Sequence, residues 1–144
     1  MSQLRTTVEA DPSTDDLNAL EGGLIAHNEQ KEVPRALVPL AVFLRDEAGN
    51  ILGGVAGNTV WGWLQIKLMW VADGLRGQGH GVRLIRAAEQ EALARGCKQA
   101  WVDTFTFQAL GFYQKQGYTI FGVLDDFPEG HTRYFLKKTD LQSG

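Results

Sequence analysis

The stretch Arg76-Gly77-Gln78-Gly79-His80-Gly81 places three glycines at alternate positions immediately before a segment with helical spacing. Glycines let the backbone pass close to a ligand because no Cβ stands in the way. The first N–H groups of a helix lack internal partners, and the helix dipole favours negative charge there by about 0.3 to 1 kcal/mol per interaction. Arg76 adds a cation, so the stretch suits a diphosphate. The glycines alone suit an ordinary strand-to-helix turn equally well.

Apolar runs with strand or helix spacing divide the rest of the chain. The predicted strands cover residues 4–8, 37–44, 51–55, 60–71, 98–104, 118–124 and 132–136. One predicted helix follows Asp11-Pro12-Ser13, which supplies an N-cap and a proline for the first turn. Two more predicted helices cover 79–95 and 107–116. A strand, helix and strand over 63–104 imply a parallel crossover, whereas the flanking hairpins are antiparallel. The fold class is therefore α/β (α+β), with a mixed sheet and helices on its faces.

The helix that follows the glycines is predicted to be amphipathic. Its apolar side comprises Leu84, Ile85, Ala88 and Ala92, and its solvent side comprises Arg83, Arg86, Glu89 and Gln90. Gly96 is a typical residue to end such a helix.

Composition and length bound the class of protein. The 144 residues match one domain, which we expect to span 1–144, with 1–10 and 139–144 loosely ordered. The net charge of -3 and the mixed signs give no basic stripe, so no nucleic-acid partner is expected. The single cysteine, Cys97, excludes an intramolecular disulfide, and no leader or long apolar run occurs. We expect a cytoplasmic protein without a membrane partner or a bound metal.

Two common phosphate-binding patterns do not fit the glycine stretch, because it lacks both the Gly-Lys-Ser/Thr ending and the Gly-x-Gly-x-x-Gly spacing. Its Arg-x-x-Gly-x-Gly pattern instead resembles that of the GNAT superfamily of N-acetyltransferases. Gln108–Tyr118 (QALGFYQKQGY) resembles the family's Ala-x-x-Phe-Tyr-x-x-x-Gly-aromatic block, and Leu68–Val71 resembles its strand before the loop. The resemblance covers about residues 40–138, with Thr106 at a position where the family commonly has Asn.

This resemblance implies a fold, a co-substrate and a reaction. The fold would be a single-domain GNAT-like one, with a mixed, mostly antiparallel sheet of six to seven strands, a parallel splayed pair and three to four flanking helices. Acetyl-CoA would be bound by backbone groups of Met69 and Val71, which pair with the pantetheine arm, and by N–H groups of Arg76 to Gly81, which hold the pyrophosphate. The acceptor would be a small-molecule or peptide amine that attacks directly in a ternary complex. A homodimer is also compatible, since dimers are common in the family.

Tyr113 matches the tyrosine of the family's Phe-Tyr pair, which lies near the CoA sulfur and acts as general acid. A phenol of pKa about 10 is a weaker acid than a thiol of pKa about 8.5, so full proton transfer is uphill by about 2 kcal/mol. Hydrogen bonding to the departing thiolate is the alternative. Packing of the short helix is the purely structural role that the same ring could have.

The general base has three candidates. Asp103 ends an apolar strand and resembles in position the Glu that serves as base in family members acetylating protein N termini, although Asp reaches less far. Capping the following loop is its structural alternative. His131 and a relayed water are the others. A base matters most for a lysine-like amine, whose deprotonation at pH 7 costs about 4.6 kcal/mol.

The acceptor is indicated only weakly. Asp125, Asp126 and Glu129 form an acidic turn that could attract a cationic amine or could simply be solvated. Trp61, Trp63 and Gln65 alternate along a predicted strand, where they would line an acceptor pocket or pack in the core. A CoA-binding sensor without turnover and a general nucleotide-binding protein are the two competing functions.

Overall fold

The computed structural model describes residues 3–31 and 36–142, and the chain divides into two units, Met1–Arg35 and Ala36–Gly144. The expected single domain over 1–144 includes residues 1–2, 32–35 and 143–144, which lie outside the described residues. Among the helices of the described ranges, none is both long enough and apolar enough to cross a membrane.

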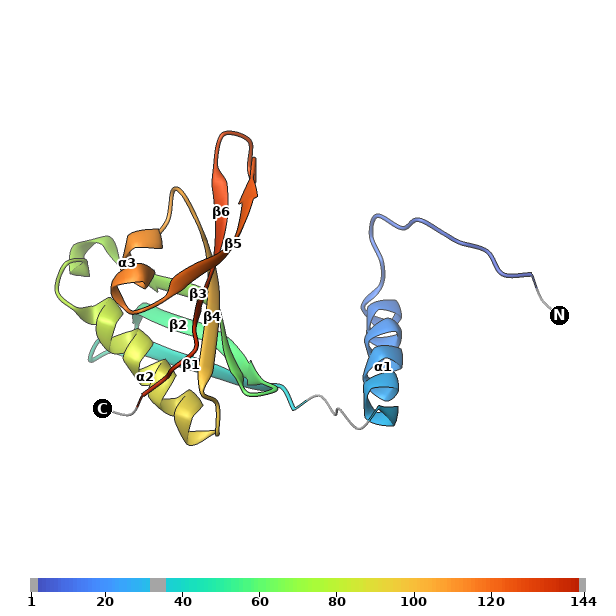
Figure 1. Ribbon diagram of the computed structural model, residues 1–144, viewed down its shortest axis with the longest axis horizontal. Helices are drawn as coiled ribbons and strands as arrows, with labels where there is room; N and C mark the ends of the chain where they lie inside the picture. Colours follow the sequence, from blue (N-terminus) through green and yellow to red (C-terminus); the bar gives the residue numbers. More distant parts are fainter. Residues whose placement is uncertain (1–2, 32–35, 143–144) are drawn as a thin grey trace. The chain divides into compact units, whose positions relative to one another are not determined.

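The first unit contains the helix α1 (Thr14–Gln30), drawn in blue in Figure 1. Ser13 is its N-cap, because the Asp16 N–H donates to Ser13 Oγ at 3.0 Å and so satisfies a free donor of the first turn. Pro12 therefore precedes the cap. The prediction that this proline belongs to the first turn was wrong. The strand predicted over 4–8 is not formed, since a strand needs a neighbour and no described strand pairs with it.

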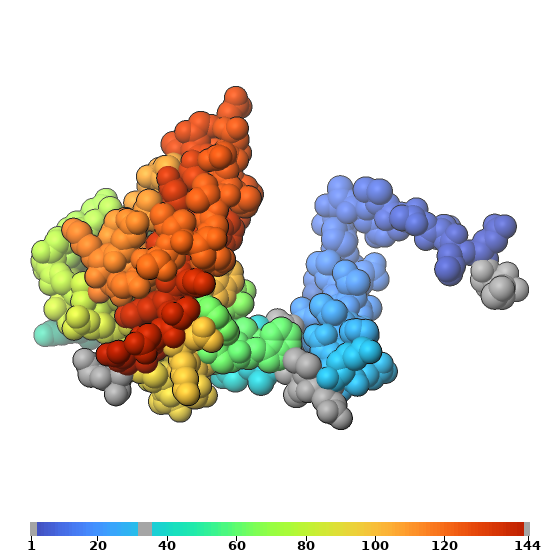
Figure 2. All heavy atoms as spheres, viewed as in Figure 1, coloured from blue at the N-terminus to red at the C-terminus, as the bar shows by residue number. Residues whose placement is uncertain are grey.

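The second unit is built on a six-stranded sheet in the order β1-β2-β3-β4-β6-β5 (Figure 1). Its strands are β1 (Val38–Arg45), β2 (Ile51–Val60), β3 (Trp63–Val71), β4 (Gln99–Phe105), β5 (Thr119–Asp125) and β6 (Thr132–Lys138). Among these strands β3 and β4 run parallel, and the other neighbouring pairs are antiparallel. The predicted mixed, mostly antiparallel sheet is confirmed. The β5–β6 hairpin stands out from the rest of this unit in the space-filling view (Figure 2).

The remaining elements of this unit are a short 3-10 helix, η1 (Asp73–Leu75), and two helices, α2 (His80–Ala94) and α3 (Leu110–Lys115). Together with α1, the described residues thus hold three α-helices, within the predicted three to four. α3 begins three residues after the predicted start at Phe107, which lies in the loop between β4 and α3.

The turn between β2 and β3 differs from the prediction. The third strand was expected to begin at residue 60, but Trp61 and Gly62 form a turn with φ of 48° and 84°. Positive φ at both central residues is what a two-residue type I′ hairpin turn requires. Trp61 therefore does not continue the alternation of Trp63 and Gln65 along β3.

β3 and β4 are paired over only part of their length, and this opens the sheet. Their pairing ends at Ile66 and Val102, although β3 continues to Val71. The next residue, Lys67, is the extra residue of a β-bulge against β2. Because a bulge bends its strand and increases the local twist, β3 turns away from β4 beyond Ile66. The β3 edge that faces β4 is left without a strand partner there.

α2 packs against β1, β2 and β3 with the predicted apolar side. Full burial of one such side chain, Ile85, contributes about 1.5 to 3 kcal/mol. Glu89, predicted to face solvent, is buried as well. The Tyr118 hydroxyl donates to Glu89 Oε2 at 2.7 Å and Lys138 Nζ to Glu89 Oε1 at 3.1 Å. The solvent prediction was wrong because Glu89 lies four residues after Ile85 and three before Ala92, at the border of the apolar side, where partners from other elements reach it.

Candidate active site

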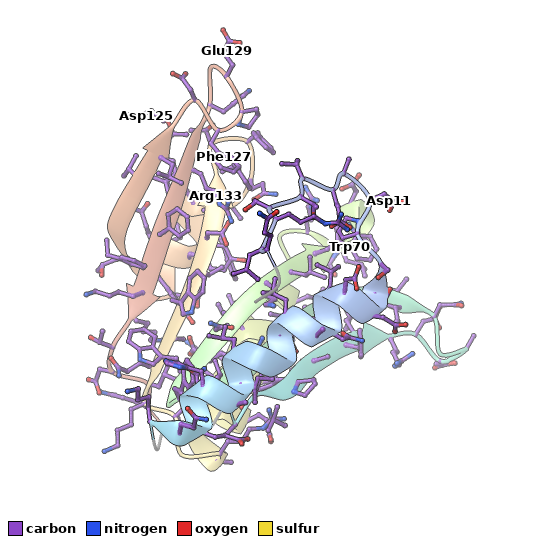
Figure 3. The ribbon with its side chains drawn as sticks, turned by 90° about the vertical axis from the view of Figure 1, so that its right-hand side faces the viewer. Asp11, Trp70, Asp125, Phe127, Glu129 and Arg133 are labelled. Atoms are coloured by element: carbon purple, nitrogen blue, oxygen red, sulfur yellow. The ribbon has the colours of Figure 1, made fainter. Side chains whose placement is uncertain are left out.

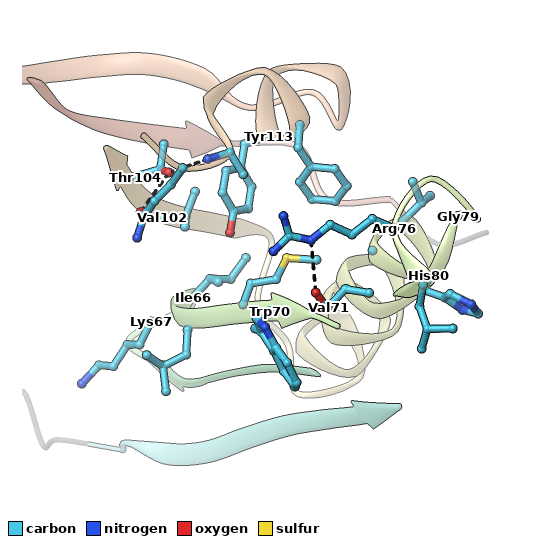
Figure 4. A pocket seen from close by; sticks show the side chains of 18 of the residues that line it. Ile66, Lys67, Trp70, Val71, Arg76, Gly79, His80, Val102, Thr104 and Tyr113 are labelled. Atoms are coloured by element: carbon cyan, nitrogen blue, oxygen red, sulfur yellow. Dashed lines mark hydrogen bonds between the residues drawn. The ribbon is translucent and has the colours of Figure 1, made fainter. Parts of the chain in front are cut away.

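A cavity of about 790 Å³ lies where β3 and β4 separate. One wall is the free half of β3 with the glycine stretch, and the other is the end of β4 with the β4–α3 loop and the start of α3. Figure 4 shows Val71 and Arg76 on the first wall and Val102, Thr104 and Tyr113 on the second. The glycine stretch and the block Gln108–Tyr118 are the two motifs that resemble the GNAT superfamily. Residues of both line this one cavity.

The glycines of the stretch adopt conformations that other residues avoid. Gly77 and Gly79 have φ of 78° and 82°, in the left-handed region, and Gly79 is the N-cap of α2. The helical hydrogen bonding begins with the Arg83 N–H, which donates to the Gly79 carbonyl at 3.2 Å. The N–H groups before Arg83 thus have no intrahelical acceptor. They form a cluster of donors at the cavity end of α2.

Gly81 is required by close packing and not by its backbone angles. A Cβ added there would lie 3.2 and 3.3 Å from two ring atoms of Phe112 and 3.5 Å from Met69 Cε. Met69, Gly81 and Phe112 all line the cavity. A side chain at position 81 would therefore require the Phe112 ring or the start of α2 to shift by a few tenths of an ångström.

Arg76 lies beside the free edge of β3. Its Nε donates to the Val71 carbonyl at 3.3 Å, and its Nη2 lies 3.3 Å from Asp73 Oδ1 in an exposed ion pair (Figure 4). The Val71 carbonyl therefore points to the cavity side and not toward β2. A ligand that pairs with this carbonyl would meet the Arg76 side chain there.

Gln78 and His80 contribute to the stretch in different ways. His80 lines the cavity, whereas Gln78 is not among the lining residues and its Nε2 donates to the Gly74 carbonyl at 3.3 Å. Arg83 Nη2 lies 2.7 Å from His80 Nδ1. Because a guanidinium only donates, His80 Nδ1 is the acceptor. The His80 ring is thus hydrogen-bonded to a side chain of the same helix, α2.

Tyr113 is buried in the cavity wall, with an exposed fraction of 5%. Its ring packs edge to face on Phe112 and Tyr118, and Figure 4 shows its hydroxyl directed into the space above β3. Burial, and then the negative charge of Asp103, raises the pKa of Tyr113 to about 12. The phenol therefore stays protonated throughout the neutral range.

Asp103 lines the same cavity but is not a free carboxylate. Arg133 Nε donates to Asp103 Oδ2 at 2.7 Å, and both side chains are about one-quarter exposed, 27% and 21%. The Arg133 guanidinium in turn lies 4.9 to 5.3 Å from the ring centres of Phe105, Phe127 and Phe135. We did not predict Arg133 from the sequence. Its sequence signal is a cation directly before the aromatic pair Tyr134 and Phe135, and the register of β4 and β6 is needed to interpret it.

The other candidates lie away from the cavity wall. His131 Nδ1 lies 2.9 Å from Thr106 Oγ1, and His131, Trp63 and Gln65 do not line the cavity. Cys97 is buried in the core, and burial raises the pKa of its thiol. Within residues 3–31 and 36–142, no group of three His, Cys, Asp or Glu side chains is placed to hold a metal ion.

Comparisons with known proteins place the chain in a family. The family model described as the acetyltransferase (GNAT) family matches residues 10–118. A blasticidin-S acetyltransferase from Streptomyces morookaense is 42% identical over 105 residues, which cover 72% of this chain and 77% of the relative. The crystal structure of a proposed acetyltransferase from Agrobacterium tumefaciens is 30% identical, with a TM-score of 0.88 over 94% of this chain and 98% of that one. An acetyltransferase structure from Bacillus cereus is 31% identical, with a TM-score of 0.81 over 92% and 96%.

Proposed function

The chain belongs to the acetyltransferase (GNAT) family, and from that premise we propose that it transfers the acetyl group of acetyl-CoA to a primary amine of a small molecule. The observation that carries the proposal is the single cavity between β3 and β4 that the glycine stretch, Tyr113 and Asp103 all line. It brings a helix start with unpaired N–H donors, a protonated phenol and a carboxylate to one place.

The first wall of the cavity suits the donor. The N–H groups from Gly77 to Gly81 would hold the pyrophosphate of acetyl-CoA, because they precede the first hydrogen bond of α2 and the helix dipole favours negative charge. The Arg76 N–H, which was predicted to join them, donates to the Asp73 carbonyl at 3.4 Å. The free edge of β3 at Met69 and Val71 would pair with the amides of the pantetheine arm. Arg76 would then leave the Val71 carbonyl and become available to a phosphate.

Tyr113 would stabilise the leaving group. In the reaction the amine nitrogen bonds to the thioester carbonyl carbon, the carbon–sulfur bond breaks, and the sulfur leaves with the bonding electrons. With the pKa of Tyr113 at about 12 and that of a thiol at about 8.5, complete proton transfer to the thiolate is uphill by about 5 kcal/mol. A hydrogen bond from the phenol to the developing thiolate is the role that this acidity supports, and the proton of CoA then comes from the acceptor ammonium or water.

Asp103 would receive the acceptor. Arg133 occupies Oδ2, and the second oxygen remains able to accept a hydrogen bond from the acceptor amine or from a water that carries its proton away. His131 is a weaker candidate, because it is bonded to Thr106 and lies off the cavity wall. Deprotonation through Asp103 and a relayed water is therefore the route that we propose.

The name of one relative supports a small-molecule acceptor, since the Streptomyces morookaense protein is a blasticidin-S acetyltransferase. A peptide amine is the other acceptor class that the reaction allows. Thiol release from acetyl-CoA, followed with polyamines, amino acids, aminoglycosides, blasticidin S and peptide N termini, identifies the acceptor class.

A CoA-binding sensor and a general nucleotide-binding protein are the functions to be distinguished from catalysis. We expect acetyl-CoA to raise the Tm of the protein and ATP or NAD to leave that shift unchanged. We expect Tyr113→Phe to keep the Tm shift and to lose most of the thiol release. Binding of acetyl-CoA with no thiol release from any amine would support the sensor instead, and displacement by ATP or NAD would support the nucleotide-binding protein.

A further inference from the structure

We infer that Phe107 determines acceptor specificity and selects amines that carry a flat aromatic ring close to the nitrogen. The inference rests on the proposed function, because it assigns the acceptor side of the same cavity. It goes beyond that function by naming the substrate class and the side chain that recognises it.

Phe107 is a large apolar side chain that lines the cavity and is 56% exposed. One face of its ring is covered, because Phe105 stacks on it at a centroid distance of 5.2 Å and an interplanar angle of 15°. Its edge is fixed by His131, whose ring lies 5.0 Å away at 83°. The ring is thus held in one orientation, and the uncovered face remains available to a ligand.

The rings beside Phe107 connect it to the carboxylate that would receive the amine. Phe105 lies 5.9 Å from Phe127, and both rings contact the Arg133 guanidinium, which binds Asp103. Figure 3 shows Phe127 and Arg133 on the β5–β6 hairpin, which has Glu129 near its tip and Asp125 at the end of β5. The wall formed by β4 and the loop after it therefore presents both the ring of Phe107 and the carboxylate of Asp103 to the cavity.

This combination favours one class of acceptor. The amino group of an acceptor can hydrogen-bond to the second oxygen of Asp103, and the acidic turn attracts it when it is cationic. An aliphatic tail gains only apolar contact from Phe107. A flat ring can stack on the open face of Phe107, and such aromatic pairs strengthen binding about threefold to tenfold beyond the buried area alone. The stack involves little loss of protein motion, because Phe105 and His131 already hold the ring.

The test compares two amines of equal carbon skeleton, 2-phenylethylamine and 2-cyclohexylethylamine, which differ in having a flat or a puckered ring. Their affinities for the protein saturated with CoA are measured by calorimetry, and their kcat/KM values are measured by thiol release from acetyl-CoA. We expect the flat amine to be preferred about threefold to tenfold in both measurements. In Phe107→Leu this preference should fall to about one, through a higher Kd and KM for the flat amine.

Phe121→Leu is the matched control, since Phe121 is also exposed but lies on β5 and does not line the cavity. It should keep the preference of the unmodified protein. Equal affinity for the two amines, or a preference that survives Phe107→Leu, would overturn the inference. If neither amine releases thiol, the proposed function is in question, and the calorimetric ratio with CoA alone still decides the role of Phe107.

Discussion

Arg133 Nε donates a hydrogen bond to Asp103 Oδ2 at 2.7 Å, which joins β6 to the end of β4 at the cavity wall. The same guanidinium contacts the rings of Phe105, Phe127 and Phe135. A guanidinium presents flat faces to the rings and N–H donors in its plane to the carboxylate, a geometry that the compact ammonium of a lysine does not reproduce. The orientation of the Asp103 carboxylate thus depends on Arg133.

Arg133→Lys should therefore lower acceptor turnover without affecting the donor. A hydrogen bond to a charged group contributes about 1.5 to 3 kcal/mol, so we expect kcat/KM for the amine to fall by at least about tenfold. The affinity for CoA, measured by calorimetry, should not change. Lys137→Gln on the same strand is the control, because Lys137 contacts Phe121 and not Asp103. Equal losses in the two variants would show that Arg133 has no special role.

Gly81→Ala should weaken CoA binding, since the added Cβ would lie 3.2 Å from the Phe112 ring and the ring or the first turn of α2 would have to shift by a few tenths of an ångström. We expect the KM for acetyl-CoA to rise at least about fivefold, because the donors of this turn would no longer be aligned. Gly74→Ala is the control, because a Cβ at Gly74 meets nothing within 4 Å. An unchanged KM in Gly81→Ala would contradict the assignment of this turn to the donor.

The buried Glu89 should be important for stability. Glu89→Leu leaves the Tyr118 hydroxyl and the Lys138 ammonium without their acceptor, so the free energy of unfolding should fall by about 3 to 5 kcal/mol. Glu91→Leu, on the same helix, breaks an exposed pair with Arg95 and should cost less than about 1 kcal/mol. Urea unfolding measures both. Similar losses of unfolding free energy in the two variants would show that the buried contacts of Glu89 stabilise the fold no more than an exposed ion pair does.

The pKa of Tyr113 predicts a pH dependence. Because the folded-state pKa is raised from about 10 to about 12, the folded protein holds this proton more tightly than the unfolded chain does. The resulting stability is fully present below pH 10 and is lost as the pH rises through 12. At pH 11 the unmodified protein should have lost about 1 kcal/mol more than Tyr113→Phe, relative to pH 9. Urea unfolding at the two pH values measures this, and parallel losses would contradict the raised pKa.

The features that depend on residues close together in the sequence could be predicted from it. The glycines before α2 and the apolar side of α2 are local patterns, and the structure has both. The mixed sheet followed from the alternation of strand and helix patterns. The resemblance to the GNAT superfamily, carried by two short motifs, is confirmed by the family match over residues 10–118.

What could not be predicted depends on pairing between distant strands. Arg133 meets Asp103 only because β6 lies beside β4 in one particular register, and no local pattern fixes that register. Glu89 lies at the border of the apolar side of α2, and its burial depends on Tyr118 and Lys138 from the C-terminal part of the chain. The roles of Tyr113 and Asp103 in the reaction remain predictions.

The transfer of a labelled acetyl group is the most direct test of the central claim. The unmodified protein is incubated with acetyl-CoA labelled in the acetyl group and with the amine panel, and the products are identified by mass spectrometry. We predict a labelled amide and free CoA in equal amounts from at least one small-molecule amine, with most of both lost in Tyr113→Phe. Intact acetyl-CoA with every amine, under conditions where it still raises the Tm of the protein, would contradict the claim.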